Sequence, residues 1–310
     1  MFKNVNIYRL DPDWSATIAS IESALEAERF TPCSATQDRS IGWVEPRGHQ
    51  HGALVESVGG QYVLKLMVEA KAVPGAVVRR EAEGRMAHIE ATTGRKPGRK
   101  EAREIREDAR QALLPMAFAK QSAVLVWIDP VARLLVTDAA SQARSDEVIT
   151  ALVRALPGLA PTWLRTAVTP QTAMARWLSA ATPEDWPPRL SIERECELKS
   201  GDEARSVVKF VRHPLLNDEI RQHIARGLLP TRLALSWDGR VAFVLTESLQ
   251  LRKIGFLEGV FDDKVDQEED RFDADIAIST AELTRLIADL AEALGGELPQ
   301  ESGRATANLA

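Results

Sequence analysis

Apolar residues recur along this chain at two spacings, one typical of strands and one typical of helices. Apolar and polar side chains alternate over residues 61–70, which predicts a strand with one apolar face. Over residues 14–28 apolar side chains lie three or four positions apart, which predicts an amphipathic helix. The same criteria predict strands over residues 2–10, 42–44, 53–58, 122–129, 133–138, 191–198, 205–212, 231–237, 240–246, 249–260 and 273–279, and helices over residues 145–156, 170–178, 216–226 and 280–294.

Two short pairs of turn residues lie between strand-like runs. Gly59-Gly60 and Asp238-Gly239 tolerate positive φ, so each predicts a β-hairpin. Hairpins mixed with helices predict an α+β fold with mixed, antiparallel-rich sheets. We expect four regions: an N-terminal α+β region (1–75), a basic helical arm (76–119), a strand pair and helix that complete the N-terminal core (120–160), and a C-terminal α+β region with an acidic segment (161–310).

The predicted arm combines helical sequence with a high density of charge. Residues 79–110 contain ten Lys or Arg and seven Asp or Glu, a local net charge of +3 in a chain of net charge −6. The stretch GRKPGRKE (94–101) holds Gly94, Pro97 and Gly98, which are unfavourable inside a helix, so it predicts a basic turn between two helices. On charge alone, a solvated helical hairpin is the simpler interpretation, because most charge runs are solvated faces.

Composition is that of an ordinary globular chain, with 45% hydrophobic and 27% charged residues. No run of eighteen apolar residues predicts a membrane span, and the N-terminus lacks the pattern of a secretory signal, so we expect a cytoplasmic protein. Residues 257–302 carry a net charge of −11, which leaves the rest of the chain at +5. The overall acidity therefore does not exclude a polyanionic partner, because local patches set the field that a ligand meets.

Candidate catalytic groups are sparse. The sequence has no phosphate-binding glycine loop after a strand and no GxSxG elbow, and Cys33 and Cys196 are too far apart for a CxxC pair. His49 and His51 lack an evident third metal ligand nearby, so an exposed loop is favoured there. The acids of residues 262–270 could form a two-metal nuclease site, although such a run is more often solvated. We predict no enzyme activity, no metal and no cofactor, and we expect the seven tryptophans to serve mainly in core packing.

Several short motifs, in a fixed order, resemble one bacterial family. They are FKNVNIYRL (2–10), FTPC (30–33), GWVEP (42–46), GRKPGRKE (94–101), LLPMAF (113–118), VWID (126–129), LALSWDGRVAFVL (233–245) and RFDADI (271–276). In order and spacing the chain resembles the recombination-associated protein RdgC family almost end to end.

That resemblance implies a crescent-shaped subunit that pairs into a ring dimer around double-stranded DNA. It implies a cytoplasmic, nucleoid-associated protein that binds DNA with little sequence preference and modulates RecA-dependent recombination and replication fork repair, with no membrane partner. Non-specific binding of this kind needs many phosphate contacts from Lys and Arg, which the arm could supply. The expected DNA-binding residues are Arg79, Arg80, Arg85, Arg95, Lys96, Arg99, Lys100 and Arg103.

The resemblance also implies a gate that closes the ring at one subunit interface. Phe118 occupies the position of the family's gate phenylalanine, and Arg212 and His213 align with a polar pair on the facing segment. Met116 stands where some relatives have a basic residue, and His213 stands where at least one has an amide, so the strength of this gate is open. Two other functions stay open: a metal-dependent nuclease that uses residues 262–270, and a protein–protein regulator that does not bind DNA directly.

Overall fold

The computed structural model describes residues 1–48, 51–201, 206–261 and 268–299. Its centre is a twelve-stranded sheet in the order β2-β4-β5-β6-β1-β12-β11-β10-β8-β9, in which β3 pairs with β4 and β7 pairs with β1. The strands are β1 (Val5–Arg9), β2 (Arg39–Val44), β3 (Val55–Val58), β4 (Gln61–Lys71), β5 (Ala119–Asp129), β6 (Leu134–Asp138), β7 (Thr162–Trp163), β8 (Leu190–Ser200), β9 (Val207–Val211), β10 (Leu228–Trp237), β11 (Val241–Thr246) and β12 (Leu251–Phe256).

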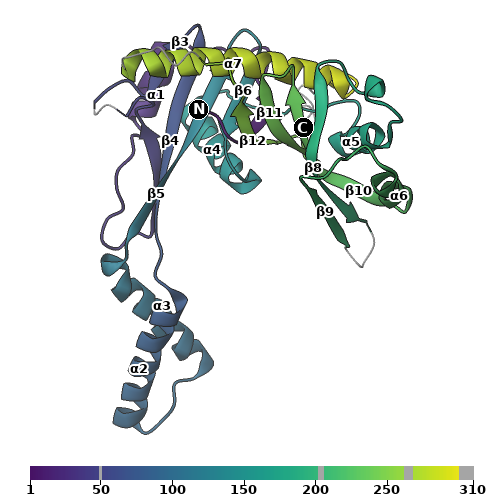
Figure 1. The fold of residues 1–310 in the computed structure, drawn as a ribbon. Helices are drawn as coiled ribbons and strands as arrows, with labels where there is room; N and C mark the ends of the chain where they lie inside the picture. The colour runs from purple at the N-terminus through teal and green to yellow at the C-terminus, as the bar shows by residue number, and fades with distance from the viewer. Residues whose placement is uncertain (49–50, 202–205, 262–267, 300–310) are drawn as a thin grey trace, which may run out of the picture.

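Helices cover both faces of this sheet, and the predicted α+β class is confirmed (Figure 1). None of the helices in the described part of the chain has the length and hydropathy that crossing a membrane requires. The helices are α1 (Ile18–Glu26), α2 (Gly75–Thr93), α3 (Arg99–Leu113), α4 (Gln142–Ala155), α5 (Pro170–Ser179), α6 (Asp218–Ala225) and α7 (Glu268–Ala293), with short 3-10 turns η1 (Leu114–Met116) and η2 (Pro183–Asp185).

Both predicted hairpins form at their turn residues. Gly59 and Gly60 have φ of 58° and 83°, and they join β3 to β4. Asp238 and Gly239 have φ of 50° and 63°, and they lie between β10 and β11. Positive φ at these positions places the flanking strands side by side, so the local sequence decides this part of the register.

The first strand joins the two halves of the chain into one sheet. Val5 of β1 is the antiparallel partner of Asp138 in β6 and also of Leu251 in β12. The strands from residue 190 onward therefore continue the N-terminal sheet instead of forming a second sheet.

Two hydrophobic cores form on opposite faces because strand side chains alternate in direction. On β1, Val5 and Ile7 belong to the core that α5 and α7 cover. Tyr8 of the same strand belongs to the core that α1 and α4 cover. Core packing by tryptophan is confirmed for five of the seven, which are at most 9% exposed: Trp14, Trp43, Trp127, Trp177 and Trp237.

The prediction of a strand over residues 273–279 and a separate helix from Thr280 is wrong. These residues are the continuous helix α7, and the Thr280 hydroxyl donates to the carbonyl of Ile276 instead of capping a helix start. Ile276 and Leu283 are buried at helical spacing against the sheet, so packing along the whole face stabilises one long helix. The Arg240 guanidinium donates two hydrogen bonds to the buried Glu282 carboxylate, at 2.9 and 2.8 Å, and so holds α7 against the β10–β11 turn.

The chain outlines an arch (Figure 1). The helices α2 and α3 project as an arm from one end of the body, at the ends of the long strands β4 and β5. At the other end, β8, β9 and β10 with α6 form a second, shorter projection. The long helix α7 runs across the sheet between these two ends (Figure 1).

Candidate nucleic-acid interface

The arm is a pair of helices with a core of its own. Ala82 of α2 and Ile105 and Ala109 of α3 are buried together, and Val78, Met86 and Ile89 pack against them. Two of the three buried side chains are alanines, so the helices can approach each other closely. Gly94 ends α2 with φ of 71°, and α3 begins at Arg99, so the predicted break at residues 94–98 is confirmed.

The surface of α3 is divided into three stripes. At 100° per residue, four arginines (Arg99, Arg103, Arg106 and Arg110) fall within about 60° of one another around the helix. The apolar residues that face α2 form a second stripe, and four acids form a third. The acids are Glu101, Glu104, Glu107 and Asp108. The segregation leaves a basic stripe that is not interleaved with acids along the helix.

Three of the eight predicted DNA-binding residues are paired with acids of the arm. Arg85 contacts Glu81 at 3.1 Å, and Lys96 lies 3.7 Å from Glu90. Arg95 makes two hydrogen bonds to the Glu101 carboxylate, at 2.8 and 3.2 Å, and these lower the pKa of Glu101. The basic turn is therefore partly neutralised by its own helices.

The other five predicted DNA-binding residues have no ion pair with any residue that the structure describes, and each of them is exposed. They are Arg79, Arg80, Arg99, Lys100 and Arg103. Arg106 shares this property but is missing from the predicted set, since that set stopped at Arg103. The spacing of 99, 103, 106 and 110 is the signal that would have included it, because residues four, seven and eleven positions apart share a helix face.

At the root of the arm, one arginine joins α3 to the body. Arg110 donates to Asp38, in the loop before β2, at 2.6 Å, and to Glu107 at 3.3 Å. Asp38 first and Glu107 second raise the pKa of Arg110. This contact crosses from the arm to the sheet, so Arg110 positions the arm as well as adding charge.

Two apolar side chains are exposed between the end of α3 and the start of β5. Phe118 is 95% exposed and Met116 is 73% exposed, although both belong to an apolar run. Packing of Phe118 beneath its own helix, the simpler expectation for such a residue, does not occur within the chain. An exposed phenylalanine beside an exposed methionine is typical of an interaction surface.

The residues predicted to face Phe118 lie at the other end of the arch. Arg212 and His213 follow β9, and Arg212 has φ of 55°. The His213 backbone N–H donates to the carbonyl of Arg194, and its ring lies 5.5 Å from the ring of Phe210. Val211, the last residue of β9, is 64% exposed beside them. The structure does not bring Phe118 and this segment together within one chain (Figure 1).

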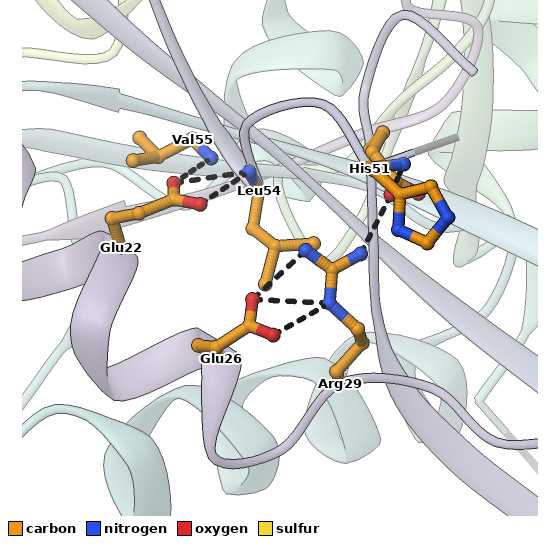
Figure 2. A network of polar contacts seen from close by, with 7 residues as sticks. Glu22, Glu26, Arg29, His51, Leu54 and Val55 are labelled. Atoms are coloured by element: carbon orange, nitrogen blue, oxygen red, sulfur yellow. Dashed lines mark hydrogen bonds and ion pairs between the residues drawn. The ribbon is translucent and has the colours of Figure 1, made fainter. Parts of the chain in front are cut away.

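Of the two candidate histidines, His49 lies outside the described residues, and His51 is held through its backbone. His51 donates its backbone N–H to the Glu45 carboxylate at 3.0 Å, and Glu45 also contacts Arg29 at 2.6 Å (Figure 2). Beside this network, the Glu22 carboxylate accepts from the backbone of Leu54 and Val55, which fixes the entry to β3 (Figure 2). The contacts recorded for His51 thus involve its peptide group, and they serve loop structure.

The candidate metal site in the acidic run at residues 262–270 falls mostly outside the described residues. Residues 262–267 of the acidic run lie outside the described residues, and residues 268–270 begin α7. Within the ranges that the structure describes, no three His, Cys, Asp or Glu side chains gather to hold a metal ion.

Comparison with known proteins identifies the family. The family model described as "Putative exonuclease, RdgC" matches residues 1–297. The chain belongs to the RdgC family. A recombination-associated protein RdgC from Dechloromonas aromatica (strain RCB) is 40% identical over 303 residues, which cover 96% of this chain and 98% of that relative. The RdgC protein of Janthinobacterium sp. (strain Marseille) is also 40% identical, over 97% of this chain and 99% of its own length, and that of Bordetella pertussis is 37% identical over 96% and 98%.

The predicted resemblance to the RdgC family is therefore confirmed over nearly the whole chain. The curated relatives are named for recombination, whereas the family model's description names an exonuclease.

Proposed function

We propose that this RdgC-family protein is a non-enzymatic, non-sequence-specific binder of double-stranded DNA. The observation that carries the proposal is the basic stripe on α3, where Arg99, Arg103 and Arg106 are exposed and have no acid partner among the described residues. Guanidinium groups suit phosphate oxygens in geometry and charge, and contacts to phosphates carry no sequence information. A projecting helix with such a stripe can lie along a duplex without reading its bases.

We further propose that two copies form a closed ring around the duplex. The exposed Phe118 lies directly before β5, at the root of the arm, whereas the exposed Val211 ends β9 in the shorter projection and Arg212 and His213 follow it. Phe118 and Val211 are apolar side chains left largely exposed, at 95% and 64%, and a second copy could cover them. In this proposal Phe118 anchors one contact, and the Arg212–His213 segment contributes to closing the ring.

The cellular role follows the family. We propose that the protein acts in the cytoplasm at the nucleoid, where it modulates RecA-dependent recombination and replication fork repair. In this proposal, residues 76–119 form the DNA-binding arm, residues 1–75 and 120–160 form the N-terminal half of the arch, and residues 161–310 form the other half. The acidic charge of residues 257–302 is then kept away from DNA by like-charge repulsion.

The direct test is a gel-shift titration with random-sequence duplexes, performed in EDTA and repeated with magnesium. We expect binding of the intact duplex in both conditions, with affinity nearly independent of sequence. If about six phosphates are neutralised, log K should fall with log salt at a slope of about −5. A flat salt response or a strong preference for one sequence would contradict the phosphate-contact mechanism.

The same titration decides between this proposal and two others. The family model's description supports a nuclease, for which magnesium should convert the duplex into shorter products. A regulator that contacts only proteins should leave the duplex unshifted even at low salt. Binding without cleavage in both buffers is the outcome that our proposal requires.

A further inference from the structure

A pocket lies at the root of the arm, where α2 and α3 meet the body. Its volume is about 590 Å³, and its lining includes three arginines, Arg79 from α2 and Arg106 and Arg110 from α3. The remaining lining residues are Val73, Gly75 and Val78. No acid is among the lining residues, so guanidinium groups supply all the charge of the pocket wall.

The three arginines differ in how they are neutralised. Arg110 is held by Asp38 at 2.6 Å and by Glu107 at 3.3 Å. Arg79 and Arg106 have no ion pair with any residue in the described ranges. Two arginines of different helices thus line the same hollow, and neither has an acidic partner among the described residues.

We propose that this pocket is an anchor for one phosphate group of the DNA backbone, held by Arg79 and Arg106 together. The inference rests on the proposed DNA binding and adds a specific site to it. Each guanidinium presents a rigid fork of donors that matches two phosphate oxygens, so one phosphate can bridge the two helices. Arg110 holds the arm in place through Asp38 and completes the positive wall.

The N-terminus of α2 adds to the attraction of this pocket for an anion. The helix α2 begins at the pocket with Gly75, and its first turn has no acidic residue. Its free backbone N–H groups therefore add positive potential toward the same hollow. A single anchored phosphate would fix where the arm sits on a strand, whereas the remaining stripe would contribute only diffuse attraction.

The experiment is a pair of double-mutant cycles on the full chain. The first uses Arg79→Gln and Arg106→Gln. The second uses Arg80→Gln and Arg103→Gln, which are exposed arginines of the same two helices outside the pocket lining. Affinity for a short random duplex is measured by fluorescence anisotropy, and thermal midpoints check that every variant is folded.

If Arg79 and Arg106 bind the same phosphate, the losses of affinity in their two single variants do not add in the double variant. Each pocket variant should weaken binding by about 10-fold, the scale of a hydrogen bond to a charged group, and the double variant should be within about 2-fold of the weaker single. In the control cycle, the fold-loss of affinity of the Arg80→Gln/Arg103→Gln double variant should equal the product of the fold-losses of the two single variants. Additive losses in both cycles, or coupling of equal size in both, would overturn the proposal.

A second measurement uses inorganic phosphate as the probe, without DNA. We expect millimolar phosphate to shift the side-chain Nε–H resonances of Arg79 and Arg106, while those of Arg80 and Arg103 stay in place. Equal shifts at all four would show a general ionic atmosphere and refute the pocket. Selective shifts with an additive DNA cycle would mean that the pocket takes free phosphate only, which also overturns the DNA assignment.

The two proposals fail separately. If the unmodified protein does not bind duplex at all, the proposed function is wrong, and the phosphate titration alone judges the pocket. If the protein binds duplex with the expected salt slope but the pocket cycle is additive, DNA binding stands and the anchor is refuted.

Discussion

Replacing Phe118 by alanine should weaken ring closure without weakening the fold. The side chain is 95% exposed within the chain, so its removal creates no cavity and exposes no core. Exposed substitutions of this kind usually change the free energy of unfolding by less than about 0.5 kcal/mol. The thermal midpoint of Phe118→Ala should therefore stay close to that of the unmodified protein.

The expected loss at the interface is larger. Burying a phenylalanine side chain against a partner contributes about 1.5–3 kcal/mol, and aromatic anchors at interfaces often exceed about 2 kcal/mol. A loss of about 2 kcal/mol corresponds to roughly 30-fold weaker closure of that contact. The second contact of a ring would be unaffected, so the protein can stay dimeric while the ring opens.

The assay compares closed circular DNA with short linear duplex. Protein is loaded on each, the salt is raised, and the fraction retained is measured over time. An open ring cannot stay topologically linked, so Phe118→Ala should lose its hold on the circle far more than its hold on the linear duplex. Val131→Ala is the matched control, because Val131 is 91% exposed in the turn after β5, away from the arm.

One pattern would refute this reasoning. If Phe118→Ala lowers retention equally on both substrates and also lowers the thermal midpoint, then Phe118 supports the fold and not a gate. Equal behaviour of the Phe118 and Val131 variants on the circle would likewise remove Phe118 from the closure of the ring.

Three further predictions address the arm and the second projection. Arg99→Gln should weaken duplex binding and reduce the magnitude of the salt slope by about 0.9. Arg95→Gln should weaken binding less, because Arg95 already contacts Glu101 at 2.8 Å. Salt titrations of duplex binding by both variants measure the difference. Ile105→Ala should destabilise the arm by about 2 kcal/mol, at the lower end for such truncations because the arm core is small, and hydrogen exchange should accelerate in the two arm helices while the sheet stays protected. Glu197→Gln should lower the thermal midpoint at pH 6 but change it little near pH 2. Burial alone would raise the pKa of the Glu197 carboxyl, but hydrogen bonds from lysines and a threonine outweigh burial and lower this pKa from 4.5 to about 2. The ionised carboxylate therefore stabilises the fold above pH 4.5, and this stabilisation is lost as the pH falls toward 2.

Each of these has a contrary outcome. Equal slopes for the Arg95 and Arg99 variants would show that ion pairing within the arm does not affect DNA contact. Loss of protection in the sheet after Ile105→Ala would show that the arm does not unfold by itself. The same change at both pH values in Glu197→Gln would mean that the ionised carboxylate is not the stabilising form.

Local sequence was sufficient for the elements whose conformation depends on a few residues. The break between the arm helices follows from Gly94, Pro97 and Gly98, and the hairpin turns follow from Gly59-Gly60 and Asp238-Gly239. Positive φ and the missing proline donor act within one turn of chain, so no distant contact is needed to predict them. The family was likewise recognisable from short motifs in order.

The conformation of residues 273–279 depended on distant packing. Their alternating apolar pattern suits a strand, but the helical spacing of Ile276 and Leu283 matches the face of a sheet made from both halves of the chain. Burial along that face stabilises a helix more than local propensity favours a strand. Only the assembled sheet provides this face, so the error could not be avoided from the local pattern.

The candidate interface was predicted in outline and decided in detail by tertiary structure. Sequence identified a basic arm and an apolar run at its end, because charge and hydropathy are properties of the residues themselves. The tertiary structure decides which side chains lie side by side. It decides that Arg95 is paired with an acid, that Phe118 is exposed, and that Arg79 and Arg106 line one pocket. Those placements are set by how α2 packs on α3 and how both join the sheet, through contacts between residues far apart in the sequence.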